Sequence, residues 1–500
     1  MPTVSMPEMP EVADPSERGG PAAAVRTDTR LHDLVIRAGL VYTPDGPRPG
    51  AVVVDGGTVT AVLPADAPVL ARDEVRLAAD EVLIPGVVDS HVHVNDPGRT
   101  DWEGFASATL AAAAGGVTTI VDMPLNSIPP TTTVAALELK RKTAAGRCAV
   151  DVGFWAGAVP ENLGGGTLAA LHEAGAFGFK AFLSPSGVPE FGHLSPAELK
   201  QTAAEIAQFG GLLIVHAEDP ELLADGDPDE EAGDPADHAD HADHDHPVGY
   251  GEFLASRPDS AEISAIAQVI EAVRTTGVRA HILHLSSAQA LPLLAQAKAE
   301  GLPVTAETCP HYVSFAAEDI PQRATQYKCC PPIRSSGNRE LLWQGLLDGV
   351  IDLIASDHSP STPELKFAGG GDFGQAWGGI AGLQVALPAV WTAARARGLA
   401  LEAVLGWMCQ GPARLTGLAD KGRIAPGARA DLVAFAPEAR FRVSARELRH
   451  KNPVSAFDGA DLVGAVRRTW LGGELAGGNH AAGDGLSTPH PPAGRLLDRP

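Results

Sequence analysis

Two histidines separated by a single residue form the first arrangement in the sequence that could do chemistry. His91 and His93 lie in VVDSHVHVNDPGR, at the end of an apolar run. Because the side chains of a β-strand alternate between its two faces, both imidazoles project from the same face and can bind one metal ion. Asp89 lies on that face too. The spacing predicts a metal site at the end of this strand, although a purely structural pair of histidines has the same pattern.

Four more polar residues stand at the ends of other apolar runs. They are Lys180 in GFKAFL, His216 in GLLIVHAE, His284 in RAHILHLS and Asp357 in DLIASDH. Each alone has an ordinary explanation: a surface lysine, a structural histidine or a strand-end aspartate. Together they predict a second metal ion, because two histidines supply nitrogen ligands and a lysine that has reacted with carbon dioxide is a carbamate that can bridge two ions. Asp357 can bind metal and accept the proton of an attacking water.

Two neighbouring histidines and the cysteines are left out of the predicted metal site. His281 lies three residues before His284, so strand alternation places it on the opposite face, and His358 is adjacent to Asp357 and faces away. The cysteines are odd in number and contain no CxxC spacing, which argues against a disulfide framework and a thiolate zinc site. They are Cys148, Cys309, Cys329, Cys330 and Cys409.

The middle of the chain predicts the fold that positions these residues. Between residues 85 and 420, apolar runs of strand length alternate with Ala- and Leu-rich segments that are compatible with helices, as in a (β/α)8 TIM-like barrel. The strand runs are 86–93, 118–123, 151–158, 178–183, 211–218, 279–286, 303–310 and 352–358. Chemistry in this fold takes place where the carboxyl ends of the strands meet. We therefore expect the candidate ligands to converge there.

The segments around the barrel predict a small accessory domain and three disordered stretches. Residues 32–84 and 421–475 contain short β-branched runs between turn signals, which predict a β-sandwich assembled from both ends of the chain. Residues 1–31 and 476–500 are predicted to be disordered tails. Residues 226–247 are an acidic, His-rich insertion, predicted to be a solvated loop, although its histidines could bind metal loosely.

The charge balance excludes several classes of partner. The chain has 62 acidic and 38 basic residues and a formal net charge of -24, which disfavours binding to nucleic acid or anionic lipid. No apolar run reaches the length of about 18 residues that a membrane span requires. The first 20 residues lack the basic flank and apolar core of a secretory signal. We expect a cytoplasmic protein that acts on a small neutral molecule.

The motifs resemble those of the cyclic amidohydrolases, the group that includes hydantoinases and dihydroorotases. The resemblance extends over about residues 32–475 and rests on DSHVHVNDPGR, GFKAFL, IVHAED, ILHLSS, TCPHY, PPIR and SDHSP. Within this group, three segments are similar to those of the allantoinases: WEGF at 102–105, AAAAGGVTTIVDMPLNSIPPT at 111–131 and WGGIAGLQ at 377–384.

The resemblance implies a centre with two zinc ions. By similarity, the first ion is held by His91, His93, Lys180 and Asp357, and the second by carboxylated Lys180, His216 and His284. The implied reaction is hydrolysis of the ring amide of (S)-allantoin to allantoate, with Asp357 transferring the proton. The resemblance also implies a homotetramer.

The resemblance also bears on the substrate, for which four candidate contacts are Asn95, Asn126, the backbone at Cys330, and Gly379. Dihydroorotases carry an Arg two residues after HxH to hold a carboxylate, and Asn95 occupies that position here. Typical hydantoinases carry a Tyr shortly after the bridging lysine, and SPSGVPEFG has none. A hydantoinase or dihydropyrimidinase remains the alternative. A noncatalytic relative is a second alternative, although such relatives lose metal ligands and this chain keeps all six candidates.

Overall fold

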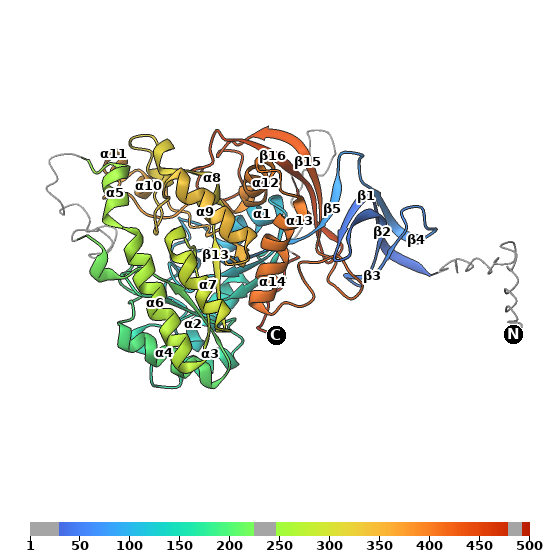
Figure 1. The fold of residues 1–500 in the computed structure, drawn as a ribbon. Helices are drawn as coiled ribbons and strands as arrows, with labels where there is room; N and C mark the ends of the chain where they lie inside the picture. Colours follow the sequence, from blue (N-terminus) through green and yellow to red (C-terminus); the bar gives the residue numbers. More distant parts are fainter. Residues whose placement is uncertain (1–29, 225–246, 479–492) are drawn as a thin grey trace, which may run out of the picture.

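The computed structural model describes residues 30–224, 247–478 and 493–500. At its centre lie parallel strands whose carboxyl ends face the same way (Figure 1). In chain order they are β6 (Val87–Val92), β7 (Val117–Asp122), β8 (Asp151–Phe154), β9 (Ala156–Gly157), β10 (Phe179–Phe182), β11 (Leu212–His216), β12 (Arg279–Ile282), β13 (Val304–Thr308) and β14 (Leu353–Ile354). They coincide with the eight predicted runs, the third of which is divided in two.

These strands close into a ring. β6, β7 and β8 form one parallel sheet and β9 to β14 form the other. β8 and β9 are separated only by Trp155, and at the other seam Val92 pairs in parallel with His358, just after β14. The amide of His93 also donates to the carbonyl of His358 at 2.8 Å. The strand that carries the HxH pair is therefore the direct neighbour of the strand that leads to Asp357, and the predicted barrel is confirmed.

Helices follow the strands and cover the outside of the barrel (Figure 1). No helix within the three described ranges is both long and apolar enough to cross a membrane. The helices are α1 (Phe105–Ala114), α2 (Val134–Ala144), α3 (Thr167–Glu173), α4 (Pro196–Gln208), α5 (Tyr250–Ser256), α6 (Asp259–Thr276), α7 (Leu291–Ala299), α8 (Pro310–Ser314), α9 (Ser336–Leu347), α10 (Pro363–Lys366), α11 (Ala368–Gly371), α12 (Ala386–Ala396), α13 (Leu401–Leu405) and α14 (Gly411–Thr416).

Local sequence signals determine where the longer helices begin and end. At the start of α4, the Ser195 hydroxyl accepts a hydrogen bond from the amide of Glu198, whose carboxylate accepts one from the amide of Ser195 at 2.8 Å. This capping box satisfies amides that have no partner within the helix. α6 ends at Gly277, whose φ of 71° lies in the left-handed region that glycine adopts without strain.

A second, mostly antiparallel sheet is built from both ends of the chain, and this part of the fold prediction is also confirmed. Its strands are β1 (Leu31–Thr43), β2 (Gly46–Asp55), β3 (Thr58–Leu63), β4 (Leu70–Arg76), β5 (Val82–Pro85), β15 (Leu432–Arg442), β16 (Asp461–Leu471) and β17 (Glu474–Gly477). β5 joins the two halves, since it lies between β1 and β15. Ile36 and Val52 from the first half share one apolar core with Leu432 and Trp470 from the second.

The C-terminal residues differ from the sequence prediction. The expected disordered tail, 476–500, overlaps the end of β17, and its last residues, 493–500, pack against β8. Leu496 pairs in parallel with Val152, whose amide donates to the carbonyl of Arg495 at 2.9 Å. The Gly- and Pro-rich composition of the segment could not reveal this pairing. β10 pairs with β9 and not with β8, so one edge of β8 remains for residues 493–500. Residues 1–29, 225–246 and 479–492 lie outside the described ranges, and with them most of the N-terminal tail and of the insertion.

Removing residues 493–500 is expected to destabilise the barrel by on the order of 3 kcal/mol, because several backbone hydrogen bonds and two half-buried leucines are lost. The amide of Leu497 donates to the carbonyl of Val152 at 2.8 Å, and the guanidinium of Arg495 donates to buried Asp151 at 3.0 Å. Thermal unfolding followed by circular dichroism measures the effect. A chain ending at residue 497 keeps this pairing and should lose less. Identical melting curves for all three chains would mean that the segment does not stabilise the barrel.

Candidate metal centre

The structure brings all six predicted ligand residues together at the carboxyl ends of the barrel strands. Each is at most 6% exposed, so their polar atoms must find partners inside the protein. They come from the ends of β6, β10, β11, β12 and β14. The residues are His91, His93, Lys180, His216, His284 and Asp357.

His91, His93 and Asp357 form the first half of this cluster. Nε2 of His91 lies 3.1 Å, and Nε2 of His93 3.6 Å, from Oδ1 of Asp357. All three donor atoms lie within 4.8 Å of one another. Nε2 of His91 is buried and makes no hydrogen bond. Two imidazole nitrogens and a carboxylate oxygen at this separation are a suitable set of ligands for a divalent metal ion.

His216 and His284 form the second half. Nδ1 of His216 lies 3.0 Å from Nε2 of His284, so the two rings point one nitrogen each at the same place. Phe182 stacks on the His216 ring with a centroid distance of 4.6 Å, which limits its rotation. Two ring nitrogens that face each other can both act as ligands if a metal ion lies beside them.

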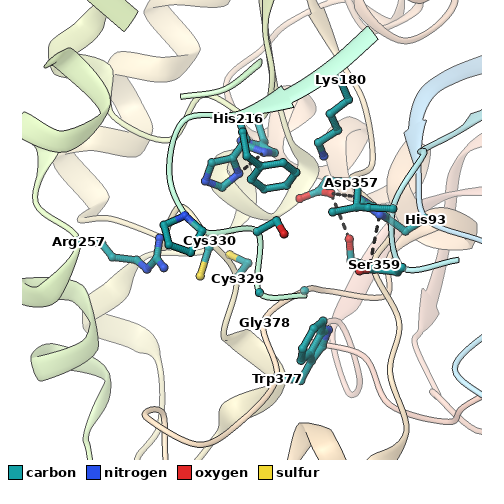
Figure 2. Close-up of a pocket in the computed structure, with 18 residues that line it drawn as sticks. His93, Lys180, His216, Arg257, Cys329, Cys330, Asp357, Ser359, Trp377 and Gly378 are labelled. Atoms are coloured by element: carbon teal, nitrogen blue, oxygen red, sulfur yellow. Dashed lines mark hydrogen bonds and ion pairs between the residues drawn. The ribbon is translucent and has the colours of Figure 1, made fainter. Parts of the chain in front are cut away.

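The amine of Lys180 lies between these two halves. Figure 2 shows it extending from β10 toward Asp357. Burial lowers the pKa of Lys180 to about 8, and the nearby Asp357 and Glu307 carboxylates only partly oppose this shift. A larger fraction of this amine is therefore neutral near pH 7 than for an exposed lysine, and the neutral form is the one that reacts with carbon dioxide.

The backbone leaves regular strand geometry before it reaches two of these residues. β12 ends at Ile282 and β14 at Ile354, while His284 and Asp357 have φ values of 34° and 46°. Non-glycine residues rarely adopt this left-handed region, and it is typical of functional sites. Strand alternation, which was used to leave out His281 and His358, therefore does not extend to His284 or Asp357.

The two histidines that were left out take other partners. His358 Nε2 lies 3.4 Å from the Glu103 carboxylate, and its Nδ1 accepts a hydrogen bond from the amide of Gly382 at 3.2 Å. His281, expected to face away, is instead buried and lies 3.0 Å from a carboxylate oxygen of Glu307. That carboxylate also contacts His91.

Two buried acids beside the cluster were missed by the sequence reasoning. Glu307 lies in β13, within TAETCP, and Glu218 follows β11, within HAED. Burial would raise the pKa of each, but His91 and His281 outweigh it at Glu307, and Arg257 and His216 outweigh it at Glu218, so both fall to about 2. The sequence did contain a signal for both residues, since each is an acidic residue in or next to an apolar run. Burying a carboxylate is costly unless it is paired, so such an acid indicates a partner.

A pocket opens onto the cluster and contains three of the four candidate substrate contacts. Asn126, Cys330 and Gly379 line it, together with Phe182, Pro185, Ser186, Gly187, Arg257, Cys329, Ser359, Trp377 and Gly378 among others (Figure 2). A Cβ atom at Gly379 would lie 2.5 Å from the carbonyl oxygen of Ser359, so this close approach of two backbone segments requires glycine.

Asn95 does not line the pocket, which corrects its predicted role as a substrate contact. It is 1% exposed, and its side-chain amide donates to the carbonyl of Pro360 at 3.2 Å. β6 ends at Val92, and Asn95 has a φ of 65°, so the chain has already turned at this position. Asn95 was a candidate because it occupies the position at which dihydroorotases carry their carboxylate-binding Arg, and in this structure that position lies beside the pocket wall and not in it.

A buried lysine ties together two segments of the pocket wall. Nζ of Lys366 donates to the carbonyls of Lys328, Trp377 and Gly379 at 2.8, 2.9 and 2.5 Å. Burial lowers the pKa of Lys366 to about 7. This one amine links the chain just before Cys329 to the glycine-rich loop opposite it, and so helps to set the shape of the wall.

Comparisons of the sequence with known proteins identify its family and its relatives. The model of the "Amidohydrolase family" matches residues 82–476. The chain is 54% identical over 467 residues to the allantoinase of Streptomyces avermitilis, covering 93% of this chain and 99% of that protein. It is 42% identical over 458 residues to the allantoinase of Arabidopsis thaliana, covering 88% of each.

Comparisons of the structure find the same fold in solved enzymes. The L-hydantoinase (dihydropyrimidinase) from Arthrobacter aurescens has a TM-score of 0.84 at 30% identity, covering 94% of this chain and 100% of that one. The D-hydantoinase (dihydropyrimidinase) from Thermus sp. has a TM-score of 0.80 at 25% identity, covering 93% and 99%.

Proposed function

The chain belongs to the amidohydrolase family, and from this premise we propose that it hydrolyses the ring amide of (S)-allantoin to give allantoate. The observation that carries the proposal is the convergence of six buried candidate ligands, five of which line one pocket. The near full-length similarity to allantoinases supports allantoin as the substrate. A hydantoinase or dihydropyrimidinase acting on a related ring remains the second candidate, favoured by the solved structures.

Two zinc ions fit the side chains present. We propose that one is held by His91, His93, Asp357 and carboxylated Lys180, and the other by Lys180, His216 and His284. Nε2 of His91, which faces Asp357 at 3.1 Å without a hydrogen bond from the described residues, and the facing nitrogens of His216 and His284 support this assignment. When bound, the ions would lower the pKa of a shared water and polarise the carbonyl of the substrate.

Asp357 is the group of this chain that moves the proton. Burial would raise its pKa, but His91 and the other imidazoles lower it well below the ordinary value, so the carboxylate is ionised. It accepts the proton of the attacking water and returns it to the leaving ring nitrogen, so one residue serves both half-reactions. The hydroxyl of Ser359 donates to its Oδ1 at 3.1 Å and fixes its orientation.

The remaining pocket walls suit a neutral cyclic ureide. Phe182 and Trp377 offer apolar surface to a ring, while Asn126 and the backbone at Cys330 and Gly379 offer hydrogen bonds to amide groups. The guanidinium of Arg257, which also lines the pocket, is neutralised by Glu218 at 2.6 Å. A substrate carboxylate would therefore meet no arginine whose charge is unmatched.

Side-by-side rates on allantoin, hydantoin, dihydrouracil and dihydroorotate test the proposal. We expect kcat/KM to be highest for allantoin and at least about 100-fold lower for dihydroorotate, since burying its unpaired carboxylate costs several kcal/mol. Ring opening is followed by loss of ultraviolet absorbance or by chromatography. Highest activity on hydantoin or dihydrouracil would favour the second candidate, and comparable rates on dihydroorotate would contradict both.

We also propose a homotetramer, supported by the resemblance to the cyclic amidohydrolases, and a location in the cytoplasm, supported by the N-terminal residues, which lack the pattern of a secretory signal. Light scattering coupled to size-exclusion chromatography measures the assembly.

A further inference from the structure

Glu307 contacts two buried histidines from two barrel strands, of which His91 is a predicted ligand and His281 is not. Its Oε1 lies 2.5 Å from Nδ1 of His91, and its Oε2 lies 3.0 Å from Nε2 of His281. His281 is held in turn at its other nitrogen by the hydroxyl of Thr305, 2.8 Å away. Both Glu307 and His91 have fully buried side chains. The carboxylate is therefore anchored through Oε2, and its Oε1 faces the His91 imidazole and also accepts a hydrogen bond from the backbone amide of His284 at 3.4 Å.

Glu218 stands in the same relation to the other half of the cluster. Its Oε2 lies 2.8 Å from Nε2 of His216 and 2.6 Å from the guanidinium of Arg257. Its side chain is 1% exposed, and that of Arg257 is 2% exposed. Arg257 thus anchors this carboxylate as His281 anchors Glu307.

The two contacts select opposite nitrogens of the two rings. An ionised carboxylate can only accept hydrogen bonds, so the ring nitrogen beside it must carry the hydrogen, and the other nitrogen is left with its lone pair. At His91 the nitrogen beside Glu307 is Nδ1, which leaves Nε2 toward Asp357. At His216 the nitrogen beside Glu218 is Nε2, which leaves Nδ1 toward His284.

We propose that Glu307 and Glu218 are positioning residues, one for each metal ion, which set the tautomer and ring orientation of His91 and His216. This inference rests on the proposed two-metal site. Among the described residues, no carboxylate contacts the imidazole of His93 or His284 in this way: Nδ1 of His93 has the side-chain amide of Asn126 at 3.5 Å, and Nδ1 of His284 has no hydrogen-bond partner there. Each metal ion therefore depends on a single anchored histidine, and each carboxylate should affect its own ion more than the other.

Metal titration of the chelated protein tests this selectivity. Glu307→Gln and Glu218→Gln keep the side-chain shape but remove the charge that selects the tautomer. Loss of such a support weakens metal binding by roughly 10–100-fold. We expect wild type to bind two Co²⁺ ions tightly, each single variant to bind one tightly and one more weakly, and the double variant to bind both weakly. The Co²⁺ absorption spectrum should change differently in the two single variants, because different ligand sets are affected.

A matched control separates positioning from loss of stability. Asp151→Asn alters another buried, ion-paired carboxylate, 2.9 Å from Lys421, at the opposite end of the barrel strands. It should lower the unfolding temperature yet leave both Co²⁺ ions tightly bound. If wild type fails to bind two ions, the proposed two-metal site is wrong. If wild type binds two ions and both Gln variants bind them equally tightly, or each variant weakens both ions to the same extent, the positioning role is wrong.

Discussion

Replacement of Lys180 by alanine should release both metal ions and lower ring-opening activity by on the order of a thousandfold or more, since the water is then no longer activated. Lys180 is the one candidate placed between the two halves of the cluster, and its carbamate would be the only anionic ligand shared by both ions. Metal content by atomic spectroscopy and activity should fall together. Intact mass is a poor test of the carbamate because acid releases carbon dioxide, whereas carbon-13 NMR near neutral pH detects it directly.

Chemical rescue tests whether the loss of metal and activity is caused by the missing carbamate. Alanine at position 180 leaves a buried space in which acetate or propionate can replace the carbamate oxygens, so either should restore part of the metal content and activity. Lys180→Arg should behave no better than the alanine variant, because a guanidinium stays protonated and does not react with carbon dioxide. Two retained zinc ions and normal turnover in Lys180→Ala, without added carboxylate, would rule out the bridging role.

The second large effect is expected at Asp357. Asp357→Asn keeps a side-chain oxygen of the same reach as a ligand but removes the proton acceptor, so kcat should fall by about 10²–10⁴-fold. KM should change much less, because Asp357 acts on the water. Steady-state kinetics with metal content measured on the same sample separates loss of the base from loss of an ion.

Ser359→Ala is the matched control for this effect. It removes only the hydroxyl that donates to Oδ1 of Asp357 at 3.1 Å, which is worth about 1 kcal/mol, or roughly fivefold in rate. Activity of Asp357→Asn at the level of Ser359→Ala, with two ions bound, would show that another group accepts the proton.

The sequence predicted the barrel and the convergence of the candidate ligands because both depend on a simple regularity. Parallel strands that alternate with helices bring their carboxyl ends to one face, so a polar residue at the end of an apolar run can be placed without knowing any loop. His91 and His93 are within or directly after β6, where this regularity holds. His284 and Asp357 also lie in the cluster, as expected. That expectation came from their position after a strand and not from the alternation of side chains.

The errors arose where the chain leaves regular geometry or where contacts are distant in sequence. Asn95 was chosen by its position in the dihydroorotase motif, and that motif does not show that the chain turns at a positive φ there and directs the side chain to Pro360. Glu307 was missed because its partner His91 is 216 residues away, and no local pattern reveals such a pairing. The C-terminal tail was predicted to be disordered because of its composition. Composition does not show that one edge of β8 can pair with a further segment.

The pairing of residues 493–500 with β8 also bears on how the chain is made. Asp151 precedes its partner Arg495 by 344 residues, and at a translation rate of about 5–20 residues per second the ribosome needs roughly 20–70 s to synthesise that interval. During this time an edge of the nascent barrel carries unpaired amides and carbonyls, which attract strands of other chains. Newly synthesised chains should therefore depend on a chaperone for longer than chains of a barrel whose strands all pair with strands close in sequence. We expect aggregation to begin among chains that are being translated on the same mRNA.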